Sequence, residues 1–90
     1  MPYLIVESDY DPPVTDEQLR AMSVALTDCL AVRGVTRMRS WLSVDRRRGF
    51  CEYTGESAES IREAYDLAKV KYARVWRGTL FEQGHPPDEG

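Results

Sequence analysis

The chain has 90 residues and a mass of 10.3 kDa, which suffices for one domain with a single core but not for two. Hydrophobic residues make up 42% and charged residues 30%, which excludes a disordered chain, and the longest apolar run, Tyr3 to Val6, is too short to span a membrane. The net charge of −3 argues against a general binder of nucleic acid or anionic membranes, because neutralising phosphates requires a surplus of Lys and Arg. We therefore expect one globular domain over residues 1–82 and a flexible tail over 83–90.

The first elements are predicted from an apolar run and a helix-capping pattern. Tyr3 to Ser8 is typical of a strand, which Pro12-Pro13 would not allow to continue. Thr15 and Gln18 have the spacing of a capping box, so a helix begins there and ends before Gly34. Its apolar positions recur at intervals of three and four residues: Leu19, Met22, Leu26, Cys29 and Leu30.

The second half of the chain predicts a hairpin, a second helix and a last strand. Thr36 to Val44 and Phe50 to Thr54 are β-prone runs around a charged loop, 45–49, and predict a hairpin. Ser57 begins a second helix that ends near residues 69–71, and Ala73 to Phe81 forms a last strand. The order βαββαβ predicts an α+β, ferredoxin-like fold with a four-stranded antiparallel sheet and two helices on one face.

Several residue types point away from metal and redox chemistry. Cys29 and Cys51 are interpreted as buried thiols, and the single histidine, His85, lies in the Pro- and Gly-rich tail. With no Cys/His pair at ligand spacing, we expect no metal and no cofactor. The start of the chain lacks the pattern of a signal peptide, which predicts a cytoplasmic protein. Arg46-Arg47-Arg48 is interpreted as a solvated loop in the otherwise basic segment 17–50.

Alternation along the strands predicts what lies on each face of the sheet. If Val44 pairs with Gly49, Trp41 lies opposite Glu52. The helix-covered face then collects Met38, Leu42, Val44, Cys51 and Tyr53. The open face collects Arg37, Arg39, Trp41, Ser43, Phe50 and Glu52, to which the first strand adds Tyr3, Ile5 and Glu7 or, as the less favoured alternative, Leu4 and Val6.

Three interpretations of this open face stay in competition. Arg37 and Arg39 can simply pair with Glu7 and Glu52 across strands. The face can instead pack on a second copy, which makes the chain a homodimer, most simply a dimeric α/β barrel. It can also hold a small ligand, and the residues that we expect to bind it are Arg37, Arg39, Trp41, Phe50, Glu52 and Glu7.

Binding of nucleic acid and catalysis are both less favoured than these three interpretations of the open face. Arg48-Gly49-Phe50 begins like the signature of an RNA-recognition domain, but Glu52 stands where a stacking aromatic is required, so we expect no nucleic-acid partner. The catalytic candidates are Glu7 and Glu52 as general bases and Arg39 as an anion stabiliser.

The run from Trp41 to Tyr53, with Ser57 to Ala64 and Arg74-Val75-Trp76, resembles the family called domain of unknown function 4242 over residues 2–81. The resemblance implies a small bacterial ferredoxin-like protein that dimerises through its open sheet faces. Some relatives are regarded as nickel-binding through histidines, a role that does not transfer to a chain whose only histidine is His85. Many relatives also have an Ala-Gly-x-Pro-Phe turn where this chain reads Ala68 to Tyr72, which implies a longer helix or a different loop.

Two hypotheses of function follow from these observations. The first is a non-catalytic homodimeric module that holds a small organic ligand, or none, at the open face. The alternative is a small cofactor-independent enzyme, similar to monooxygenases or isomerases of this fold, that uses Glu52 or Glu7 as a base beside Arg39.

Overall fold

The strand β1 (Tyr3–Asp9) lies inside a four-stranded antiparallel sheet, hydrogen-bonded to β3 on one side and β4 on the other. The computed structural model describes residues 3–81, and its sheet has the strand order β2-β3-β1-β4. The other elements are α1 (Asp16–Ala31), β2 (Thr36–Leu42), β3 (Arg48–Thr54), α2 (Ala58–Ala68) and β4 (Arg74–Gly78). The predicted order βαββαβ is confirmed.

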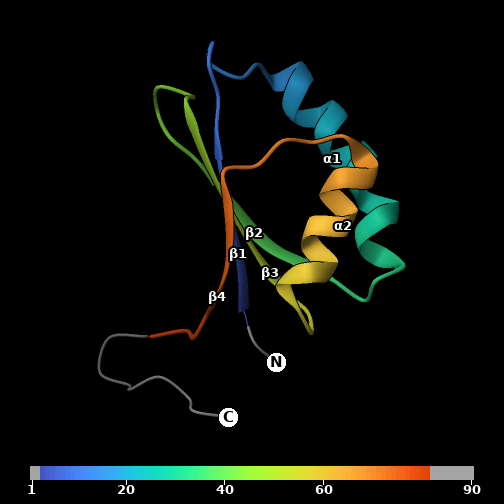
Figure 1. Cartoon of the computed structure of the whole chain (residues 1–90). Coiled ribbons are helices and arrows are strands. Elements are labelled where there is room, and N and C mark those ends of the chain that lie inside the picture. Colours follow the sequence, from blue (N-terminus) through green and yellow to red (C-terminus); the bar gives the residue numbers. More distant parts are fainter. Residues whose placement is uncertain (1–2, 82–90) are drawn as a thin grey trace.

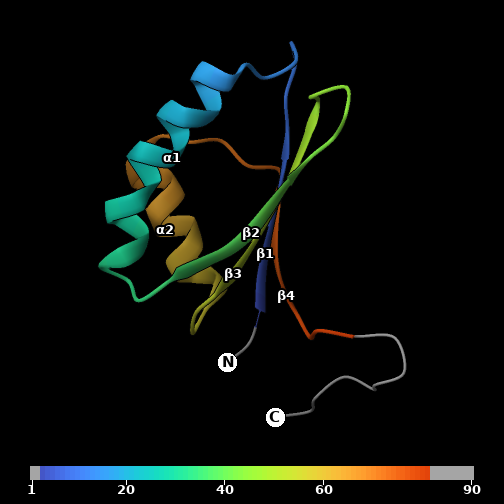
Figure 2. The ribbon, with the colours of Figure 1, turned by 180° about the vertical axis from the view of Figure 1, so that it is seen from behind.

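Both helices cover the same face of the sheet, and the other face is bare (Figures 1 and 2). The sheet is open within the chain and does not close into a barrel. The ferredoxin-like prediction is thus confirmed for one chain, while the dimeric barrel stays a prediction. No helix among residues 3–81 has the length and apolar composition needed to cross a bilayer.

The core fills the space between the two helices and the covered face. Leu4 and Val6 of β1 and Tyr53 of β3 are fully buried against Ile61 and Tyr65 of α2. The hydroxyls of Tyr53 and Tyr65 share a hydrogen bond of 2.6 Å, which satisfies two polar groups that would otherwise be costly to bury.

The helix ends form as their sequences predict. The Thr15 hydroxyl accepts from the Gln18 amide, and the Gln18 side chain accepts from the Thr15 amide, which makes the capping box reciprocal. Ser57 caps α2 by accepting from the Ser60 amide. At the other end of α2, Lys69 takes a left-handed conformation with φ of 58°. Glycine is the residue most favoured in this conformation at the end of a helix, and here a lysine adopts it. The helix α2 ends at Ala68 and is not extended through the following residues.

The hairpin differs from the prediction in its register. Leu42, not Val44, lies opposite Gly49, and Val44 is fully exposed in the loop. The reason is a turn that begins at Ser43: its hydroxyl donates to Asp45 and accepts from the Arg48 amide. Such local side-chain hydrogen bonds compete with the strand ladder and end β2 early.

The last strand is shorter than predicted. It ends at Gly78 because that residue pairs with Tyr3, the first residue of β1, so no partner strand continues beyond it. The predicted flexible tail, 83–90, lies outside the described residues, as does His85.

Candidate functional site

A β-bulge in β2 decides which arginine lies on which face. Arg37 pairs with Tyr53 and Arg39 with Glu52, so two positions of β3 are opposed by three of β2, and Met38 is the extra residue. In a regular strand the side chains of Arg37 and Arg39 would lie on the same face. The extra residue shifts the strand by one position and places them on opposite faces of the sheet.

The prediction that Arg37 belongs to the open face is therefore wrong. Its guanidinium lies on the helix-covered face, 5.7 Å from the centre of the Tyr53 ring, and donates to the Ser23 hydroxyl of α1 at 2.9 Å. Partial burial alone would lower the pKa of Arg37, but the interactions with Tyr53, Cys51 and Tyr65 together outweigh it and raise the pKa, which keeps the cation charged. Met38, predicted on the covered face, is about half exposed, and Thr54 Oγ1 lies 4.0 Å from its sulfur.

On the open face, Glu52 is the acceptor for two side chains of β2. Arg39 Nε lies 2.9 Å from one carboxylate oxygen, and Trp41 Nε1 donates to the same oxygen at 3.0 Å. Trp41 lies opposite Phe50 in the register, not opposite Glu52 as predicted, and still reaches the carboxylate diagonally. The predicted pairing of Arg39 with Glu52 across strands is confirmed.

Glu7 repeats this arrangement on the other half of the open face. Trp76 Nε1 of β4 donates to its carboxylate at 2.8 Å, and the guanidinium groups of Arg48 and Arg74 lie 3.9 Å away. The Trp76 ring also packs edge-on against Phe50, with ring centroids 6.2 Å apart. Trp76 was not predicted as a site residue, because its place on the open face follows from its pairing with Ile5 in the sheet, which the sequence alone does not reveal.

A hollow of about 300 Å³ lies at the hairpin end of this face. Of the predicted ligand-binding residues, Glu7, Trp41 and Phe50 line it, together with Arg48 and Arg74. Arg39 and Glu52 lie beside the hollow and do not line it. The arrangement combines aromatic walls with charged groups of both signs, which suits a small polar ligand.

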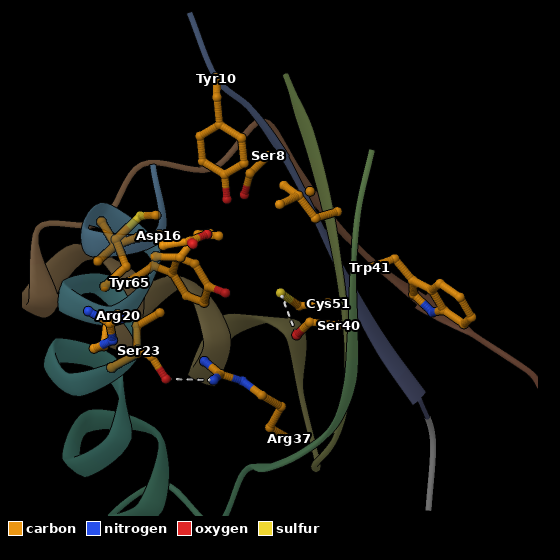
Figure 3. A pocket seen from close by; sticks show the side chains of 16 residues that line it. Ser8, Tyr10, Asp16, Arg20, Ser23, Arg37, Ser40, Trp41, Cys51 and Tyr65 are labelled. Atoms are coloured by element: carbon orange, nitrogen blue, oxygen red, sulfur yellow. Dashed lines mark hydrogen bonds between the residues drawn. The ribbon is translucent and has the colours of Figure 1, made fainter. Parts of the chain in front are cut away.

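A larger cavity, of about 490 Å³, lies on the opposite face between α1 and the sheet (Figure 3). Arg37 reaches into it, whereas the Trp41 ring points away from it on the far side of β2. No pattern in the sequence predicts this cavity.

Residues 3–77 match the model of a family described as nickel responsive protein SCO4226-like. Among solved structures, the chain is similar to the crystal structure of SCO4226 from Streptomyces coelicolor A3(2), with a TM-score of 0.78 and 18% sequence identity over 89% of this chain and 99% of that chain. At this identity the likeness supports the fold alone. No curated protein matches the chain.

The donor atoms in residues 3–81 do not fit a nickel ion. Nickel favours imidazole and thiolate ligands, but nowhere in this part of the chain do three His, Cys, Asp or Glu side chains gather into a metal site. Cys51 accepts a hydrogen bond from the Ser40 hydroxyl, and Cys29 lies on α1. We derive no chemistry through nickel for these residues.

Proposed function

The chain belongs to the SCO4226-like family, and we propose that it is a non-catalytic binding module that works as a homodimer, with the open faces of two sheets packed together. A small polar ligand would bind in the hollow at the hairpin end of that face. The observation that carries the proposal is a pair of large aromatic side chains left uncovered on the open face: Trp41 is 60% exposed and Trp76 41% exposed.

The hydrogen bonds of these two side chains support burial by a partner. Each indole N–H already donates to a carboxylate of its own chain, Trp41 to Glu52 and Trp76 to Glu7. A second copy can therefore cover both rings without leaving a buried donor unsatisfied, which is the usual penalty for burying tryptophan. Two-fold packing would bring the same face of each copy together.

The same hydrogen bonds favour binding over catalysis. Glu52 accepts from Arg39 and Trp41, and Glu7 accepts from Trp76, so donors of the sheet itself already occupy one oxygen of each candidate base. A general base needs a lone pair directed at the substrate proton, which leaves only the second oxygen of each carboxylate for that role. We therefore keep the enzyme hypothesis as the alternative: in an enzyme, Glu52→Gln would reduce turnover by orders of magnitude, whereas in a binding module it would only change ligand affinity.

Sedimentation velocity of the purified chain tests the homodimer. We expect a dimer for the wild type and a monomer for Trp41→Lys, because a second cation would be buried in a packed sheet interface beside Arg39, which already pairs with Glu52. Val44→Lys is the control, since it places the same charge on an exposed apolar residue of the hairpin loop, away from the face, and should leave the dimer intact. A monomeric wild type, or a Trp41→Lys variant that stays dimeric, would contradict the proposal.

A further inference from the structure

The cavity between α1 and the sheet has the size and walls of a small-molecule site. Its volume of about 490 Å³ falls within the range of ligand pockets, and it exists because α1 packs chiefly on α2 and little on the edge strand β2. The apolar side chains that line it come from three regions of the chain: Leu19, Met22 and Leu26 of α1, Leu42 of β2, and Val70 after α2.

The charges around the cavity favour an anion. Arg20 and Arg37 line it, and within residues 3–81 neither forms an ion pair with a carboxylate. The one acidic residue of the lining, Asp16, is already paired with Arg46. The cavity therefore presents an excess of positive charge to whatever enters it.

Arg37 is placed to anchor such an anion. Ser23 accepts one of its five N–H donors, and the ring of Tyr53 lies against the guanidinium. These contacts fix the side chain over the cavity, and the remaining donors can bind a carboxylate in the bidentate geometry that guanidinium favours.

Hydroxyl groups complete the polar contacts at the other end. The hydroxyls of Ser8 and Tyr10 point into the cavity opposite Arg37 (Figure 3). On the floor between the two ends, the Ser40 hydroxyl donates to Cys51. The guanidinium group of Arg37 thus lies at one end of the cavity, the apolar side chains lie in the middle, and the hydroxyls of Ser8 and Tyr10 lie at the other end.

We propose that this cavity binds a small organic acid whose carboxylate pairs with Arg37 and whose aromatic or branched body lies among the apolar side chains. The site lies on the face of the sheet opposite the proposed dimer interface. All of its lining comes from one chain, so it does not depend on the homodimer.

Isothermal titration calorimetry with 2-naphthoate as the probe tests the site. We expect saturable binding to the wild type, at least about tenfold weaker binding to Arg37→Met, and only partial recovery of the affinity in Arg37→Lys, which keeps the charge but not the bidentate guanidinium. Arg39→Met is the matched control, because it makes the same change on the same strand but on the other face, and it should bind as the wild type does. The neutral probe 2-naphthamide should bind the wild type at least about tenfold more weakly than the acid.

Two-dimensional NMR locates the bound probe. Side-chain methyl signals of Leu26 and Leu42 should shift, while the indole N–H signal of Trp76 on the open face should not. The inference is overturned if the wild type does not bind 2-naphthoate, if the amide binds as tightly as the acid, or if Arg39→Met weakens binding and Arg37→Met does not. Repeating the titration with Trp41→Lys separates the two proposals. A Trp41→Lys monomer that still binds 2-naphthoate shows that the cavity works without the dimer, whereas a variant that binds 2-naphthoate but stays dimeric contradicts only the dimer.

Discussion

The buried pair of Tyr53 and Tyr65 makes the stability of the fold sensitive to alkaline pH. Burial raises the pKa of both hydroxyls above the ordinary value for tyrosine. In the unfolded chain these groups lose their protons near pH 10. Above that pH the unfolded state binds fewer protons than the folded state, so the free energy of unfolding falls as pH rises toward the raised pKa of the folded state.

We therefore expect urea unfolding to show a loss of about 1.4 kcal/mol per pH unit for each such tyrosine above pH ~10. Tyr65→Phe should be less stable at neutral pH by about 1–3 kcal/mol, because the Tyr53 hydroxyl loses its partner, but it should lose stability less steeply at alkaline pH. Equal slopes for the wild type and Tyr65→Phe would contradict this account.

At the level of single residues, five of the six residues predicted to bind a ligand could be placed on the open face from the sequence. Glu7, Arg39, Trp41, Phe50 and Glu52 lie where strand alternation predicts. Arg37 does not lie on this face, because alternation holds only in a regular strand and nothing in the sequence around Met38 indicates a bulge. Its consequence is large: the misplaced arginine is the one that reaches the cavity under α1.

Among the elements, the end of α2 offers a direct test of backbone strain. Lys69 has φ of 58°, a conformation that costs a residue with a Cβ about 1 kcal/mol and glycine almost nothing. Lys69→Gly should therefore stabilise the chain by about 0.5–1 kcal/mol in urea unfolding, even though Lys69 is not one of the residues of the hydrophobic core. Lys71→Gly, two residues on and without a positive φ, should not stabilise. A Lys69→Gly variant no more stable than the wild type would show that the lysine side chain compensates for the strain.

The ends of an element could be predicted where nearby side chains determine them, and less well where pairing with a distant strand determines them. The capping residues Thr15 and Ser57 set the helix starts from within their own turns. The ends of the strands depend on partners distant in sequence: Gly78 ends β4 because β1 begins at Tyr3. The turn around Ser43 was missed because its side-chain hydrogen bonds are not visible in hydrophobic alternation.

For the molecule as a whole, the family description raises the question of nickel. We expect calorimetric titration of the chain with nickel chloride to reveal no stoichiometric site, because residues 3–81 assemble no three suitable ligands and the sequence holds one histidine. His85→Ala, tested beside the wild type, removes that histidine. Stoichiometric binding that survives His85→Ala would contradict the expectation and point to ligands contributed by two copies.

The arrangement of layers followed from the sequence, but the cavity did not. The order of elements is enough to place both helices on one face of the sheet. How far α1 stands from β2 depends on how Leu26 and Leu30 pack against α2 and the core, a matter of side-chain volumes that periodicity does not encode. The cavity between α1 and the sheet could therefore not be predicted from the sequence pattern.

The bulge in β2 also makes this edge strand of the sheet less able to pair with a strand of another chain. An exposed, flat, seven-residue edge strand offers unpaired backbone groups to any other strand, and such edges lead to aggregation. Met38 interrupts the regular spacing of those groups, and the flanking arginines, pointing in opposite directions, place a charge on either side of the strand. A neighbouring chain that aligned with β2 would meet an irregular hydrogen-bonding edge and two cations, so continuous extension of the sheet through β2 is disfavoured.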